Sequence, residues 1–107
     1  MLPRDTALEA ALARLDRLPR GHALDLRTYK RNRSVLLRKN PDGSILVVEN
    51  GYARQRFENV GRDKLPKLLG TLMKREFPRS NFIRLYDLGE HDPDAPAQGG
   101  APQRKVI

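Results

Sequence analysis

Residues 33–58 read RSVLLRKNPDGSILVVENGYARQRFE, and this stretch decides the fold. Apolar and polar residues alternate in three segments of it, as they do in strands that bury one face. These segments are 33–39, 44–49 and 52–58. The sequences between them, NPDG at 40–43 and NG at 50–51, consist of turn-forming residues. Two tight turns predict an antiparallel meander, in which each strand pairs with the next one.

The lengths of the two turns predict which residues face each other across the strands. A four-residue first loop places Leu37 opposite Leu46, and a two-residue second loop places Val48 opposite Ala53. Directly opposed residues share a face of the sheet. The predicted core face contains Val35, Leu37, Leu46, Val48, Ala53 and Phe57, with Gln55 as its polar member. The predicted open face contains Leu36, Arg38, Ile45, Val47, Tyr52, Arg54 and Arg56.

Two amphipathic helices are expected on either side of the meander. Residues 5–18 carry leucines at helical spacing, and residues 63–76 carry a wider apolar stripe. Thr6 and Glu9 have the spacing of a capping box, and Asp63 is the expected N-cap of the second helix. Two further strands are expected at 22–29 and 81–88.

We therefore predict an α+β fold with the order α-β-β-β-β-α-β, in which an antiparallel meander sheet carries two helices packed on one face. Residues 1–88 are expected to form a single domain, and the Pro- and Gly-rich residues 89–107 a disordered tail. The α-β-β-β-α part resembles the double-stranded-RNA-binding domain in element order alone. The extra strands depart from that domain, and the basic motif that it carries at the start of its second helix is absent.

Positive charge is the clearest chemical feature of the chain. Its 107 residues include 21 Lys and Arg against 13 Asp and Glu, which gives a formal net charge of +8. Six basic side chains fall between residues 27 and 39, with no acidic residue among them. They are Arg27, Lys30, Arg31, Arg33, Arg38 and Lys39. Such a concentration on an ordered surface predicts a polyanionic partner, above all nucleic acid.

We predict a small basic nucleic-acid-binding domain whose contacts are backbone-led and weakly sequence-specific, with RNA and DNA both open. The candidate contact residues are Arg27, Lys30, Arg31, Arg33, Arg38, Tyr52, Arg54, Arg56, Arg62, Lys64 and Lys67. Among them, Tyr52 is expected to stack on a base. The alternative is a protein-interaction or homodimerisation module that uses Leu36, Ile45 and Val47 on the open face.

No pattern in the chain predicts catalysis, a cofactor or a bound metal. Cysteine is absent, which excludes disulfides and thiolate sites. The two histidines, His22 and His91, lie far apart in the sequence, and none of the carboxylates is expected to form a close pair. The N-terminal segment has no continuous apolar region, and no stretch reaches the roughly 18 apolar residues of a membrane span. We therefore expect no signal peptide, no membrane partner and a cytoplasmic location.

Overall fold

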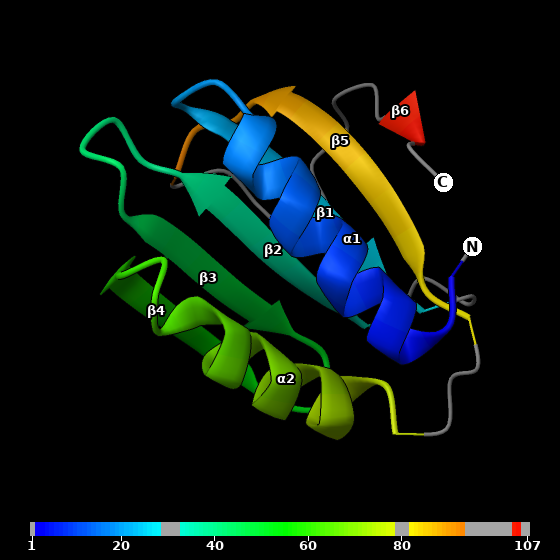
Figure 1. Ribbon diagram of the computed structural model, residues 1–107. Coiled ribbons are helices and arrows are strands. Elements are labelled where there is room, and N and C mark those ends of the chain that lie inside the picture. The colour runs from blue at the N-terminus through cyan, green and yellow to red at the C-terminus, as the bar shows by residue number, and fades with distance from the viewer. Residues whose placement is uncertain (1, 29–32, 79–81, 94–103, 106–107) are drawn as a thin grey trace.

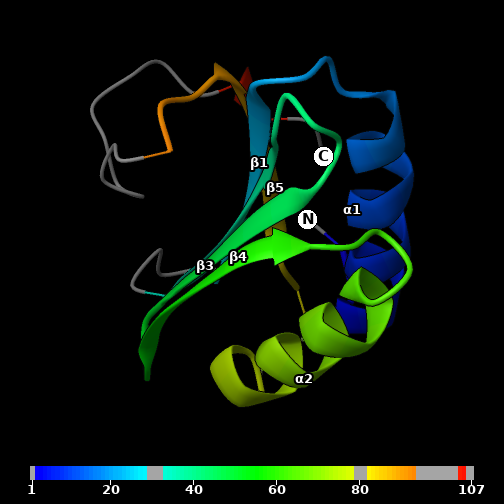
Figure 2. The ribbon, with the colours of Figure 1, turned by 90° about the vertical axis from the view of Figure 1, so that its left-hand side faces the viewer.

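The computed structural model describes residues 2–28, 33–78, 82–93 and 104–105. Its elements are α1 Arg4–Arg17, β1 His22–Arg27, β2 Ser34–Lys39, β3 Ile45–Asn50, β4 Arg54–Val60, α2 Leu65–Glu76, β5 Arg84–Glu90 and β6 Arg104–Lys105. The six strands form one antiparallel sheet in the order β4-β3-β2-β1-β5-β6. Both helices cover the same face of this sheet (Figures 1 and 2). The predicted α+β class, the meander and the one-sided helices are confirmed.

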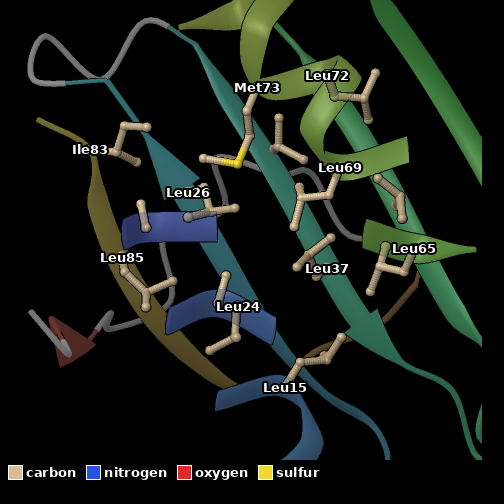
Figure 3. Packing of buried hydrophobic residues seen from close by; sticks show 14 of the residues in the cluster. Leu15, Leu24, Leu26, Leu37, Leu65, Leu69, Leu72, Met73, Ile83 and Leu85 are labelled. Carbon is tan, nitrogen blue, oxygen red and sulfur yellow. The ribbon is translucent and has the colours of Figure 1, made fainter. Parts of the chain in front are cut away.

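The core lies between the two helices and the sheet, because each helix has a single apolar stripe. From α1, Ala7, Ala11 and Leu15 are buried at i, i+4 and i+8. The stripe of α2 meets leucines of β1 and β2 in the same layer (Figure 3). The cluster contains Leu24, Leu26, Val35, Leu37, Ile45, Val47, Leu65, Leu69, Leu72, Met73, Phe77, Ile83 and Leu85.

Neither helix uses the N-cap that the sequence predicts. Helix α1 begins at Arg4, directly after Pro3, and forms no side-chain cap, so Thr6 lies within its first turn. Helix α2 begins at Leu65 with Lys64 in the N-cap position, and Asp63 lies one residue before it. Prolines explain both starts, because their fixed φ suits the residues around a first helical turn without help from a cap.

The loop between β2 and β3 is one residue longer than the sequence predicts. Lys39 pairs with Ile45, so the loop contains the five residues 40–44. Inside it, the Asn40 N–H donates to the Ser44 carbonyl at 2.8 Å, and the Ser44 N–H donates to the Asp42 carboxylate at 2.9 Å. These bonds incorporate Ser44 into the turn, and the slip of one residue turns β3 over relative to the prediction.

The loop between β3 and β4 differs as well, because it contains the three residues Gly51–Ala53 instead of two. Val48 pairs with Arg56 rather than with Ala53. The pairing of β4 with β3 is thus shifted by three residues from the predicted one, which is again an odd number. Two odd shifts cancel, so β4 keeps its predicted faces and only β3 is inverted.

The inversion of β3 corrects both predicted faces. Ile45 and Val47 belong to the core, whereas Leu46 and Val48 lie on the open face. Ala53 lies in the turn and contributes to neither face. The predicted core positions of Val35, Leu37 and Phe57 are correct, as are the open-face positions of Leu36, Arg38, Arg54 and Arg56.

The predicted homodimerisation surface is therefore wrong. Ile45 and Val47 are 2% and 0% exposed beneath the helices, and cannot share an open patch with Leu36. Leu36 lies on the other face and is itself buried.

The sheet ends differently at its two edges. Strand β5, whose position the sequence leaves open, pairs with β1 and continues to Glu90, two residues beyond the expected domain limit, and β6 pairs with it. Most of the tail that we expected to be disordered lies outside the described residues. At the opposite edge, β4 is mostly exposed, and a bulge places Asn59 at a φ of 57°.

The inverted β3 predicts unequal effects for two neighbouring valines. Val47→Ala should lower the free energy of unfolding by about 1.5–3 kcal/mol, since it removes two buried carbons and leaves a cavity under α2. Val48→Ala, on the open face, should cost less than about 1 kcal/mol. Urea unfolding followed by circular dichroism measures both values. Equal costs, or a larger cost at Val48, would contradict this register.

Candidate nucleic-acid interface

The structure divides the predicted contact residues into groups with different surroundings. Arg27 is only 5% exposed and forms an ion pair with Asp25 on the open face of β1. It therefore presents no guanidinium at the surface. Lys30 and Arg31 lie outside the described residues.

Asp25 is fully buried beside Arg27, between Leu36 of β2 and Tyr86 of β5. Its Oδ2 accepts a hydrogen bond from Arg27, and its Oδ1 has no partner among the described residues. Burial raises the pKa of Asp25 to about 7, and the Arg27 guanidinium limits that rise. This part of the open face is thus a buried polar centre within the sheet.

Glu76, at the end of α2, holds the turn between β3 and β4. Its Oε1 accepts the Tyr52 N–H at 2.7 Å, and its Oε2 accepts the Ala53 N–H at 3.1 Å. The packing is tight, because a Cβ added to Gly51 would lie 2.3 Å from Glu76 Oε1. Arg33 donates to the Glu76 carbonyl at 3.2 Å, and its guanidinium lies 6.0 Å from the centre of the Tyr52 ring. The predicted residues Arg33 and Tyr52 are therefore brought together at this turn.

A second buried carboxylate, Glu49, lies next to Glu76 and corrects the expectation that no carboxylates come close. Arg75 Nε donates to Glu49 Oε2 at 2.8 Å. Burial raises the pKa of Glu49, against the effect of Arg75. Burial acts in the same direction on Glu76, but hydrogen bonds from Glu49 and from the turn outweigh it and lower the pKa of Glu76. The two neighbouring carboxyl groups therefore have pKa values shifted in opposite directions, upward at Glu49 and downward at Glu76.

Arg62 also has a structural partner. Its Nε and Nη2 donate to the two oxygens of Asp16, at 2.7 and 3.1 Å, which joins the end of α1 to the loop before α2. The bonds from Arg62 lower the pKa of Asp16. Arg62 is therefore engaged with a carboxylate and is not one of the available cations.

The solvent side of α2 carries three lysines in one row and no acidic residue among them. Lys64, Lys67, Thr71 and Lys74 follow at i, i+3, i+7 and i+10, and all four are exposed. The three lysines form no ion pair or hydrogen bond through their ammonium groups with any described residue. Lys74 was not among the predicted contacts, although its helical spacing from Lys67 was visible in the sequence. The three lysines are called the α2 lysine row below.

Strand β4 runs beside α2, in the opposite direction. The short segment 61–64 connects the end of β4 to the start of α2, and Glu76 fixes the end of α2 to the turn before β4. Arg75 adds a contact to Gln55 of β4 at 3.4 Å. Arg54 is exposed and has no ion-pair partner among the described residues, and it lies on the open face of this edge strand.

Arg38 and Arg56 meet at one open pocket of about 510 Å³ on the face of the sheet away from the helices. Leu46 and Pro93 also line it, together with the carboxylates of Asp42 and Glu58. Arg56 lies 3.4 Å from Glu58. Two of the predicted open-face arginines, Arg38 and Arg56, are therefore brought to this pocket, but acidic side chains lie close to them.

The chain matches no known protein family, curated protein or solved structure. Its likeness to the double-stranded-RNA-binding domain therefore remains one of element order. Neither described helix is long and apolar enough to cross a bilayer. Among the described residues, no three acidic or histidine side chains are grouped so that they could hold a metal ion.

The raised pKa of Asp25 predicts a pH-dependent stability. A carboxyl whose pKa is higher in the folded chain stabilises the fold fully below its unfolded value, 3.8, and loses that contribution as pH rises through about 7. Asp25→Asn still offers an oxygen to Arg27 but does not ionise. Relative to the natural chain it should therefore gain up to about 4 kcal/mol of unfolding free energy between pH 4 and 8.

Asp42→Asn provides the control, because hydrogen bonds from Ser44 lower the pKa of this exposed carboxyl. Its difference from the natural chain should stay constant above about pH 5. Denaturant unfolding at several pH values measures both differences. If Asp25→Asn instead loses stability as pH rises, the ion pair with Arg27 dominates over burial.

Proposed function

We propose that this chain is a small nucleic-acid-binding domain that contacts mainly the phosphate backbone and has a weak preference for nucleotide sequence. The observation that supports it most is the α2 lysine row, which is exposed and without an acidic residue on its stripe. A lysine ammonium at the surface is a mobile point charge that pairs with phosphate without fixed geometry. The proposal is a binding role and includes no catalytic step.

The length of the row favours a polymer over a small anion. Ten residues separate Lys64 from Lys74, which is about 15 Å along a helix axis. That distance corresponds to about four base-pair steps of B-form DNA. Arg54, on the neighbouring strand, extends the positive surface around the β4 edge. A chain of phosphates can contact several of these cations together and release the counterions that each phosphate holds.

The chemistry of the row also accounts for the weak sequence preference. Contacts to phosphates position a nucleic acid but do not read its bases. Tyr52 is 76% exposed beside this surface, and Arg33 lies near its ring. A base stacked on Tyr52 would add affinity with little discrimination, because every base presents a flat face.

Loss of the α2 lysine row should weaken binding far more than an equal loss of charge elsewhere. Lys64→Gln, Lys67→Gln and Lys74→Gln, combined, should raise the dissociation constant by about 10- to 100-fold at low salt. The slope of log K against log salt should fall by about 2–3, since each lost phosphate contact removes about 0.7–0.9. Fluorescence anisotropy with 20-nucleotide DNA and RNA, single- and double-stranded, measures both quantities.

The control combines Arg14→Gln, Arg17→Gln and Arg20→Gln on α1 and the loop after it. Both triple variants carry the same net charge. The control should bind within about threefold of the natural chain. Equal losses in the two variants would show that binding follows net charge alone, and no binding by the natural chain would end the proposal.

A further inference from the structure

The chain that follows β5 crosses to the open face of the sheet and lies against two of its arginines. The Arg38 Nε donates to the His91 carbonyl at 2.6 Å, and the Arg56 Nη1 donates to the Pro93 carbonyl at 2.9 Å. The His91 N–H donates to the Gly21 carbonyl at 2.9 Å, which fixes the start of the crossing. Figure 2 shows this segment leaving β5 on the side of the sheet away from both helices. Residues 91–93 are called the strap below.

The two hydrogen bonds from Arg38 and Arg56 to the strap end on backbone carbonyls, which are neutral acceptors and do not offset the charge of a guanidinium. The nearby acidic side chains include Asp92 of the strap itself and Glu58, which lies 3.4 Å from Arg56. A phosphate oxygen forms a charge-assisted hydrogen bond with arginine, which is roughly twice as strong as a bond to a neutral acceptor. A phosphate that reaches Arg38 or Arg56 therefore competes favourably for each bond that the strap makes.

The pocket beside the strap gives a ligand access to both arginines. Arg38 and Arg56 line it together with Pro93. Asp42 and Glu58 line the same pocket, so a single small anion would meet as many carboxylates as guanidiniums. A polymer already bound along α2 has an advantage over a small anion. Its neighbouring phosphates are held close to the pocket, which gives them a high effective concentration there.

We propose that Arg38 and Arg56 form a second phosphate-binding surface on the open face of the sheet, for single-stranded nucleic acid, and that the strap covers these two arginines until the strand displaces it. This inference rests on the proposed function. The occupant is a single strand, because the α2 lysine row and these arginines lie on opposite sides of the β4 edge, and a flexible strand can pass around that edge.

The first test follows the strap directly in the natural full-length chain labelled with ¹⁵N. Titration with a 20-nucleotide oligothymidylate should shift the His91 and Asp92 amide signals and lower their heteronuclear NOE, with the midpoint that anisotropy gives. Inorganic phosphate at the same phosphate concentration should leave these signals unchanged.

The outcomes separate the inference from the proposed function. If the strap amides stay unchanged while those of Lys67 and Thr71 shift at saturation, the second surface is wrong and the proposed function stands. If the strap amide signals shift but the triple lysine variant binds as tightly as the natural chain, the proposed contact on α2 is wrong. Equal effects of inorganic phosphate and the oligonucleotide would overturn the choice of a polymer.

The second test weakens the strap without touching the arginines. Pro93→Gly gives the released strap more conformational freedom, and it should tighten oligothymidylate binding by about two- to fivefold. The same substitution in a chain with Arg38→Gln and Arg56→Gln should have no effect, because the strap then covers nothing that binds. A gain of the same size in both chains, or in neither, would overturn the inference.

Discussion

The carboxylate of Glu76 determines how the second half of the molecule is assembled. Its two oxygens accept the N–H groups of Tyr52 and Ala53, which have no strand partner at that point. Hydrogen bonds to a charged group contribute about 1.5–3 kcal/mol each, and a buried N–H left without one costs about 1–3 kcal/mol. Because Glu76 ends α2 and the turn begins β4, this one group fixes the two elements side by side. The relative positions of the α2 lysine row and Arg54 depend on it.

The sequence predicts the elements and their order well, because each rests on local information. Helical spacing of leucines and strand alternation are properties of short segments. The faces of β3 depend on loop length, which the local sequence left ambiguous by one residue at each turn. Ser44 joins the first turn through Asp42, and Tyr52 and Ala53 join the second through Glu76. The second of these contacts joins residues more than twenty positions apart, so turn propensity alone does not reveal it.

The same reasoning explains which basic side chains are paired within the fold and which remain available. Arginines tend to be engaged within the fold, since the planar guanidinium fits a carboxylate with two bonds. Arg62 meets Asp16, which lies 46 positions earlier in the sequence, and Arg75 meets Glu49, 26 positions earlier. From composition alone, these guanidiniums would be counted as positive surface charge. Their carboxylate partners are distant in the sequence and become visible only in the fold. The lysines of α2 remain in solvent, and this was visible from the polar side of their helical repeat.

The exposed edge of β4 also affects whether several copies of the molecule can associate through their sheets. An edge strand presents a regular series of unpaired backbone groups, to which another molecule can add a strand. Here the edge carries Arg54 and Arg56, and a bulge at Asn59 interrupts its regular spacing. Two copies approaching edge to edge would bring like charges together and would fail to align beyond the bulge. Sheet growth between molecules, the first step towards fibrils, is thereby discouraged at this edge.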